Sequence, residues 1–582
     1  MNKSERIRKL AWAFLLLALP LFSYPLAWHL VWGRGVPEWD LVHPVNLAVI
    51  ALTALAAAAA EPRRILKAWR SSLLLRTFFI SGLLCAAAAA FQQLLYGGSW
   101  ENFFYALFAV TLPWAGIALA PELKRILPWW CSGLFVLLLV TTVRTPMCIG
   151  FVGNWNWNFT LLALTLAGLV VLVFRSRWRL AAAGAAVSLG VVAVFICFPE
   201  FAPRGTLAGV IGAAVSLALV LLFKRRERWR YALLAALASG ALFISAVNTS
   251  QSSALGSSRV QLWRGGLEFA LAHTVVGVGP ARFESRIPPY LPPEYFLSDF
   301  PAVRHPHPHN ELLYLWAGFG LAGIFYFLMC IAVSARQISS RDPVGLWIMW
   351  SFLLLLIHGM FDVHLATPLA GTLCFLMLGT ICGGGFSGPS CRIPLSRRYA
   401  AALILLAGAL ILAGLHYRSG DALREGRLAL GRNDKAAALQ FFRRSVEIWP
   451  TAPALYMAGQ VEFFDFHRPD DALFWWSRIH NELRMPSFLH LNRLMGHACD
   501  VTGRYPLAFH YFEKETRDFP FSAINAGLKL GLLQKIKAPP ERIREAAAVF
   551  DRCMQMRNLA PGDFPKLLRE PRLDDEPLVR PK

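Results

Sequence analysis

Charged residues are scarce in this chain, and acidic residues are the scarcer kind. Asp, Glu, Lys and Arg make up 16% of the 582 residues, whereas apolar residues make up 56%. A soluble globular domain carries more charge and fewer apolar residues. The mean hydropathy is +0.45, and the apolar residues are clustered in long runs. The composition therefore excludes a soluble globular protein. It indicates membrane-spanning helices, each of which needs about 20 apolar residues.

Several common binding motifs are also missing. The ten cysteines are scattered, most lie inside apolar runs, and none forms a CxxC pair, so we expect inert thiols. Cys499 and Cys553 lie in the charged C-terminal part, where an oxidising compartment would allow them to pair. The net charge is +22, but no zinc-finger, RNP or basic-zipper pattern accompanies it. We therefore expect no nucleic-acid partner and attribute the charge to the basic cytoplasmic loops of a membrane protein.

The apolar runs predict an all-α, polytopic helical membrane protein with about 12–13 transmembrane helices. The runs lie at 10–32, 41–60, 73–95, 102–120, 127–143, 157–174, 179–198, 205–223, 231–248, 311–334, 344–358, 365–382 and 399–417.

The Lys and Arg residues of the short connecting segments predict the orientation. With the N-terminus in the cytoplasm, the inner segments carry about 24 of them. The outer segments carry only Arg34, Arg144 and Arg204. The long segment 249–310 then lies outside, and an odd number of spans also sends the chain after residue 417 outside.

The C-terminal part, 418–582, is charged and contains an internal repeat. Gly426, Ala438, Phe442 and Pro450 have the same spacing as Gly496, Ala508, Phe512 and Pro520. Ala472 and Trp476 fall 34 residues after Ala438 and Phe442. This period predicts a soluble domain of tetratricopeptide-like helical repeats, with a plain helical bundle as the alternative. Such a domain could bind a protein partner on its concave surface.

The outer segment 249–310 holds the candidate site. A helix is predicted to begin at Ser258, and Gly277 to Pro280 to form a turn. The segment ends in His305-Pro306-His307-Pro308-His309-Asn310, directly before a glycine-containing span. His309 and Asn310 therefore lie at a helix N-terminus, which suits an anion. The alternative is that Asn310 only caps the helix and His309 is an ordinary interfacial residue.

Two arginines, Arg204 and Arg259, are expected on the outer side, against the general bias. An arginine in this position often binds an anion, but a salt bridge to Glu200 or Glu268 or a lipid head group would also explain it. No metal site is expected, because prolines separate His305, His307 and His309 and the outer segments contain no D-x-D pair.

Taken together, these motifs resemble the O-antigen ligase and polymerase superfamily. That family has an Arg near the outer end of a middle span and an R-x-x-x-W at the start of a large outer loop. A G-x-G turn comes next in the loop. A His-Asn-x-x-L motif then leads into a glycine-containing span. The matching residues here are Arg204, Arg259 with Trp263, Gly277 with Gly279, and His309-Asn310 with Leu313.

The resemblance implies a transferase that takes a glycan from a polyprenyl diphosphate to a lipid, glycan or protein acceptor at the outer membrane face. Arg259 and Arg204 are then expected to stabilise the diphosphate leaving group, and His309 to orient or deprotonate the acceptor. We assign substrate binding to Asn310, Trp263, Arg264 and His307. The resemblance implies no metal, and we expect no cofactor.

These expectations give four regions and a cellular location. We expect N-terminal transmembrane helices at 1–148 and a ligase-like core at 149–385. The last span and its basic linker should cover 386–417, and the repeat domain 418–582. The expected location is the bacterial inner membrane, with the C-terminal domain periplasmic or extracellular.

Alternatives remain in the same and in other classes. A polymerase or a protein oligosaccharyltransferase has the same motifs as a ligase, which we rank first. A transporter would use ionisable residues in the membrane, for which His358, Asp362 and His364 are the candidates. A membrane-anchored repeat scaffold would leave the large outer loop without a function.

The orientation can be tested with alkaline phosphatase fusions, because this enzyme is active only outside the cytoplasm. We expect an active fusion after Arg418 and an inactive fusion at Arg226. The reverse pattern would overturn the predicted topology.

Overall fold

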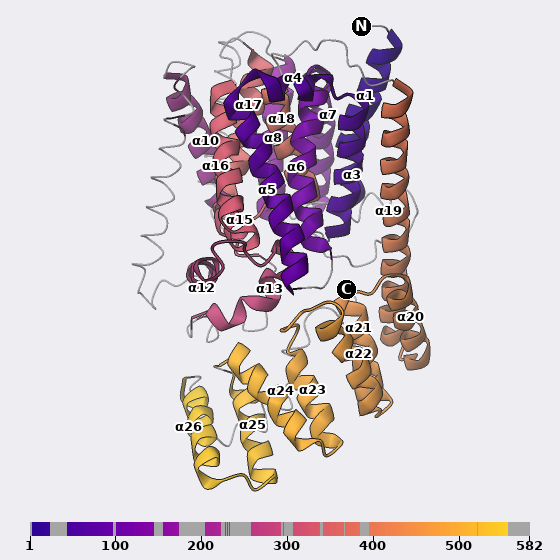
Figure 1. Ribbon diagram of the computed structural model, residues 1–582, viewed down its shortest axis with the longest axis vertical. Helices are drawn as coiled ribbons and strands as arrows, with labels where there is room; N and C mark the ends of the chain where they lie inside the picture. Colours follow the sequence, from indigo (N-terminus) through magenta and orange to yellow (C-terminus); the bar gives the residue numbers. More distant parts are fainter. Residues whose placement is uncertain are drawn as a thin grey trace.

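The described part of the chain is helical, in agreement with the predicted fold class (Figure 1). The computed structural model describes residues 3–23, 44–96, 100–144, 155–173, 204–222, 258–292, 307–337, 342–365, 367–383, 395–520 and 522–556, with isolated positions at 227, 230, 232 and 295. No strand occurs within these ranges. The chain is a helical membrane protein, whose bundle lies above a smaller group of helices in Figure 1.

Most predicted runs correspond to one helix of the bundle, with bounds within a few residues of the prediction. The first helices are α1 (Lys3–Ala18), η1 (Leu19–Ser23), α3 (Pro44–Ala60), α4 (Arg63–Ser71), α5 (Leu73–Tyr96), α6 (Glu101–Ala118), α7 (Ala120–Arg144), α8 (Trp155–Val173) and α10 (Arg204–Leu222). Further along are α15 (Glu311–Phe319), α16 (Leu321–Gln337), α17 (Pro343–His358), α18 (Pro368–Gly383) and α19 (Leu395–Gly431). The predicted runs at 179–198 and 231–248 lie outside the described residues.

Three described helices are long and apolar enough to cross a membrane: Leu73–Tyr96, Ala120–Thr142 and Ser396–Gly431. Val45–Ala60 and Arg63–Ser71 would together form a fourth span, bent by 85°. Shorter apolar helices, including Pro343–His358 and Pro368–Gly383, pack among them. The predicted number of 12–13 spans stays a prediction.

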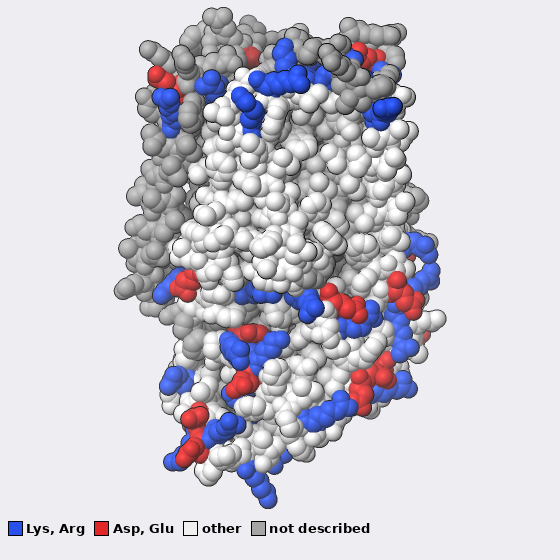
Figure 2. Space-filling model, viewed as in Figure 1, with Lys and Arg blue, Asp and Glu red and all other residues white. Residues whose placement is uncertain are grey.

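The charged residues lie at the two ends of the bundle. Figure 2 shows a wide band of uncharged surface, with Lys and Arg gathered at the end that carries α4. Both signs of charge are mixed at the other end, where the C-terminal helices lie. We call this second end the tail side. The uncharged band fits the hydrocarbon core of a bilayer.

Close helix contacts depend on small residues in the bundle. A side chain at Gly116 of α6 would lie 2.6 Å from the carbonyl oxygen of Leu376 and 2.9 Å from Cα of Gly379, both in α18. Lipid provides no hydrophobic driving force between helices, so such small residues allow the close packing that holds membrane helices together. This contact places α18 at the centre of the bundle.

The predicted span 311–334 is two helices, α15 and α16, separated at Gly320. Gly320 has a φ of 61°, and a Cβ there would lie 2.4 Å from the carbonyl oxygen of Val275. The next amide, of Leu321, donates to the carbonyl of Thr274 at 2.8 Å. The predicted run is therefore not one continuous helix, because the segment that contains Thr274 and Val275 folds back and provides a hydrogen-bond acceptor at this point. That the two helices form one span stays a prediction.

Helix α19 continues without a break through the expected boundary at 417–418 and leads into the C-terminal helices. These helices are α20 (Lys435–Ile448), α21 (Ala452–Gln460), η5 (Val461–Asp465), α22 (Pro469–Asn481), α23 (Leu491–Val501), α24 (Tyr505–Asp518), α25 (Ala523–Lys535) and α26 (Pro540–Met556). We call residues 418–556 the tail.

A glycine of one helix packs against an aromatic ring of the next at three places in the tail. A Cβ at Gly426 would lie 2.4 Å from Phe442, and one at Gly496 would lie 2.5 Å from Phe512. Between them, Gly459 faces Trp476 in the same way. The recurrence fits the predicted internal repeat, whose assignment as tetratricopeptide repeats stays a prediction.

Substitution of these glycines should destabilise the tail. We expect Gly496→Ala to lower the free energy of unfolding of residues 418–560, expressed alone, by about 1–3 kcal/mol through the clash with Phe512. Gly531→Ala is the matched control, since no atom lies within 4 Å of that position in α25; it should be neutral or stabilising by up to about 1 kcal/mol. Urea unfolding followed by circular dichroism measures both. Equal effects, or a disordered parent domain, would contradict the packing.

Candidate functional site

The first two site helices run side by side on the tail side of the bundle. These are α12 (Ser258–Ala272), which begins where it was predicted, and α15. Leu267 of α12 packs against Leu313 of α15. Beyond the end of α12, the amide of Val278 donates to the carbonyl of Ala317 at 2.9 Å. The two helices are therefore parallel, and their N-terminal ends, near Arg259 and His309, lie together.

His309 has an unusual backbone conformation directly before α15. Its φ is 49°, in the left-handed region, which costs a non-glycine residue about 1–3 kcal/mol. The Nε1 of Trp263 donates to the carbonyl of His309 at 3.2 Å and holds it in place. The conformation allows the next residue, Asn310, to cap α15: its Oδ1 accepts from the amide of Leu313 at 3.0 Å. Asn310 therefore has the capping role that was weighed against substrate binding.

The turn between α17 and α18, residues 359–367, is bound to the start of α15. The Nδ2 of Asn310 donates to the carbonyl of Met360 at 2.8 Å, and the amide of Glu311 donates to the carbonyl of Gly359 at 2.7 Å. The buried carboxylate of Glu311 accepts from the amides of His364 and Leu365. The first two residues of α15 thus fix both ends of this turn.

The fixed turn presents Asp362 to His309. The Nδ1 of His309 and Oδ1 of Asp362 are 3.0 Å apart, and Asp362 is fully buried while His309 is partly exposed. Burial alone would raise the pKa of Asp362. The hydrogen bond with His309 and the charges of His309, His364 and His307 outweigh burial and hold that pKa well below its usual range. The ionised carboxylate can therefore accept a hydrogen bond from Nδ1–H of His309, and in the tautomer that this bond selects the lone pair of the ring lies on Nε2.

Arg259 lies at the same turn. Its Nη1 donates to the carbonyl of Phe361, the residue before Asp362, at 3.2 Å. The ring of Phe361 also faces Trp263, with 6.4 Å between ring centroids. Arg259 and His309, which are 50 positions apart in the sequence, therefore contact neighbouring residues of one turn, Phe361 and Asp362. Their roles in one site stay a prediction.

The other expected site residues have different positions. His307 is buried beside His309, with 4.6 Å between ring centroids. Arg264 is half exposed, and its Nε lies 3.7 Å from Glu268, so it has the salt-bridge partner that was considered for Arg259. Helix α10 begins at Arg204, but the side chain of Arg204, like all of His305, lies outside what the structure describes.

A buried chain of polar side chains connects the start of α10 to the turn. The hydroxyls of Thr206 and Thr160 are 3.0 Å apart, and Thr160 lies 2.7 Å from Nδ1 of His358. His358 in turn contacts Nε2 of His364. Helix α10, which Arg204 begins, is thereby held at the same end of the bundle as the turn. The convergence of Arg204 with Arg259 and His309 stays a prediction.

Two residues that the sequence analysis did not assign to this site are essential to its geometry. Asp362 was noted only as a candidate for a transporter, and Glu311 was not assigned at all. Each lies next to a residue of the motif in space or in sequence. Glu311 follows Asn310 directly, so an acidic residue at a predicted helix N-terminus was the signal available for it.

Three of these side chains could hold a metal ion. The ligand atoms of His307, His309 and Asp362 all lie within 4.8 Å of one another. From the sequence, we expected the prolines to keep the side chains of His307 and His309 apart. In the structure these side chains lie together. Two imidazoles and a carboxylate suit zinc, but the contact between His309 and Asp362 also satisfies both groups without an ion.

Comparison with known families finds a match that includes part of this region. Residues 202–328 match the model of a family described as O-antigen ligase, and this segment contains α10, α12 and α15. The match supports the O-antigen ligase superfamily. At that level it indicates a membrane glycosyltransferase of the ligase or polymerase type and, with the apolar helices, a bacterial membrane protein. No curated protein matches the chain.

Chelation tests whether the three side chains need a metal. We expect glycan transfer by the purified protein to continue in EDTA, because the proton of Nδ1 already occupies the space between His309 and Asp362. Loss of turnover in EDTA, with recovery after addition of Zn²⁺ or another divalent cation, would show that the cluster is a metal centre.

Proposed function

We propose that the protein transfers a glycan from a polyprenyl diphosphate carrier to an acceptor hydroxyl at the periplasmic face of the bacterial inner membrane. The observation that carries the proposal is the meeting of Arg259, His309 and Asp362 at the turn 359–367. A cation, a base and an anion that orients the base are the groups that this transfer needs.

The diphosphate leaving group would bind at the N-terminal ends of the helices. Arg259 lies in the first turn of α12, and His309 precedes α15. Helix N-termini carry partial positive charge, which adds to that of the guanidinium group. Arg204 begins α10 and is our third candidate for this role. These groups would stabilise the negative charge that develops as the bond from the sugar to the diphosphate breaks.

His309 would act on the acceptor. The acceptor hydroxyl oxygen forms the new bond to the anomeric carbon, its proton moves to Nε2 of His309, and the electron pair of the broken bond leaves with the diphosphate. Asp362 positions the ring and stabilises the imidazolium that forms, as the aspartate of a catalytic triad does. Trp263 contributes by fixing the carbonyl of His309.

Among the acceptors, a lipid-linked core saccharide, as used by a ligase, remains our first choice. A growing glycan would make the protein a polymerase, and a protein acceptor would make it an oligosaccharyltransferase. One contact favours a role of the tail in acceptor or partner binding: Phe519 packs against Leu262 of α12 and Tyr295 of the outer loop. A tail that touches α12 could hold a partner near Arg259.

The transporter alternative loses the residues on which it depended. Asp362 binds His309, and His364 contacts His358 at the end of α17. These groups lie at the tail-side end of the bundle, whereas a transporter needs them near the middle of the membrane.

Five variants test the proposed site in a transfer assay with a lipid diphosphate donor. We expect His309→Ala and Asp362→Asn each to reduce kcat about 100-fold, or about 2.7 kcal/mol. Because both act through one imidazole, the double variant should be no slower than His309→Ala. Arg259→Ala should be equally slow, and Arg259→Lys should recover little, since a point charge cannot replace the forked contact.

Arg70→Ala, an exposed substitution on α4 at the opposite end of the bundle, is the control for loss of charge and should retain full turnover. Multiplicative effects of His309→Ala and Asp362→Asn would show that the two residues act separately. Full activity of both single variants would refute the proposed function.

A further inference from the structure

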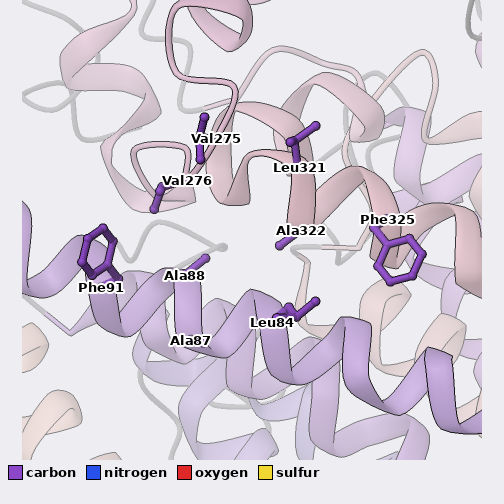
Figure 3. A pocket seen from close by; sticks show the side chains of 9 residues that line it. All are labelled: Leu84, Ala87, Ala88, Phe91, Val275, Val276, Leu321, Ala322 and Phe325. Atoms are coloured by element: carbon purple, nitrogen blue, oxygen red, sulfur yellow. The ribbon is translucent and has the colours of Figure 1, made fainter.

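An apolar groove opens between α5 and α16 on the side of the bundle, away from the turn 359–367. Its volume is about 470 Å³, and all of its lining side chains are apolar (Figure 3). They come from α5, from the turn after α12 and from the start of α16. Val275 is 75% exposed and Phe91 and Leu84 are nearly half exposed, so the groove opens outward.

Hydrogen bonds from one side chain and from the backbone hold the groove open. The Nε2 of buried Gln92 donates to the carbonyls of Val276 and Gly318, both at 2.7 Å. The amide of Leu321 donates to Thr274, which fixes the turn against the start of α16. The walls of the groove are therefore tied to one another, so the groove does not need a ligand to form.

The groove lies on a helix that is predicted to span the bilayer, and it opens away from the bundle. α5 is one of the three long apolar helices, and most of its apolar window lies outside the core of the bundle. The groove lies along the second half of α5, toward the tail side. An apolar surface within the bilayer contacts acyl chains. An acyl chain can fill the groove without desolvating any polar group, because all of the lining side chains are apolar.

A cationic cluster lies at the tail-side end of the same helix. Tyr96, the last residue of α5, is about 6 Å along the axis from Gln92. The guanidinium carbons of Arg282 and Arg286 lie 5.6 and 4.9 Å from its ring. We call these two residues the arginine pair. His273, whose Nε2 is 3.3 Å from the hydroxyl of Tyr290, lies beside them, two residues before Val275 of the groove.

The arginine pair concentrates like charge. Arg282 is almost completely buried. Burial and the neighbouring Arg286 lower the pKa of Arg282 to about 10, with Glu101 acting in the opposite direction. Burial and Arg286 also lower the pKa of His273. Two guanidinium groups in such a place gain most from an anion with several oxygens, which a phosphate provides.

We propose that the groove and the arginine pair form one binding site for an anionic phospholipid of the surrounding bilayer. An acyl chain would lie in the groove against Phe91 and Val275, and the phosphate would contact the partly exposed Arg286, beside the buried Arg282. An apolar groove beside α5 and a cationic pair against the last residue of the same helix match the two parts of such a lipid. The site lies at the far end of α12 from Arg259, about 20 Å along the helix, and does not depend on the proposed function.

Native mass spectrometry of the full-length protein in neutral detergent tests the site. We expect the protein to retain phosphatidylglycerol and to bind phosphatidylcholine much more weakly. Arg286→Ala should weaken phosphatidylglycerol binding about tenfold, and Arg286→Lys should recover part of the affinity. Ala88→Trp should also weaken it, because the indole would fill the groove. Leu83→Trp, on the exposed face of α5 but outside the groove, is the matched control and should bind like the parent protein.

Three results would overturn the proposal. If Arg286→Ala bound phosphatidylglycerol as tightly as the parent protein, the phosphate would not contact the arginine pair. If the two phospholipids bound equally well, the groove would bind apolar chains without recognising the head group. If a polyprenyl diphosphate at equal concentration displaced phosphatidylglycerol, and Ala88→Trp also weakened the binding of both lipids, the groove would instead be assigned to a glycan carrier. Transfer activity of Arg286→Ala, measured separately, distinguishes this site from the one at Arg259.

Discussion

The candidate site depends on the attachment of one turn to the start of one helix. Asn310 and Glu311 together bind residues 359, 360, 364 and 365 of the turn after α17. Without this attachment, Phe361 and Asp362 would have no fixed position relative to His309 and Arg259. Asn310 and Glu311 are fully buried, so the loss of one partner would leave a desolvated polar group, which costs more than the hydrogen bond gains. The buried contacts therefore keep the partly exposed ring of His309 in one orientation.

Glycines allow the close backbone contacts that hold α12 against α15 and α16. At Gly277, with a φ of 74°, a Cβ would lie 2.6 Å from the carbonyl oxygen of Gly318, and the break at Gly320 brings Thr274 onto α16. These close backbone contacts join the C-terminal ends of α12 and α15. As the helices are parallel, their N-terminal ends are brought together at the opposite end of the pair. The G-x-G turn thus acts on the site at a distance, through two rigid helices, and the same turn forms one wall of the apolar groove.

The sequence was sufficient for the elements of the site but not for the contacts between them. Arg259 and His309 could be predicted because each lies in a local pattern at a predicted helix start. Asp362 could not be predicted, because its position next to His309 arises from packing between segments 53 residues apart. In the sequence, a single acidic residue near a helix end does not indicate any one role. The break at Gly320 was missed for a similar reason. Three glycines lie close together in that run, and only the carbonyl of Thr274, from the turn after α12, selects the one at which the helix ends.

The tail adds a constraint that neither the repeat pattern nor the family match would suggest. α19 joins the last span to the tail as a single helix, so the tail cannot rotate freely about a flexible linker at that point. At its other contact, Phe519 packs against the cluster formed by Leu262 and Tyr295. Its ring is also tilted against that of His490, whose Nδ1 lies 2.6 Å from Oε1 of Glu515. Leu262 lies on α12, one turn from Arg259. A partner that shifts α24 would therefore act on Phe519 and, through Leu262, on the helix that carries the candidate diphosphate ligand, whereas α19 would resist any larger movement of the tail as a whole.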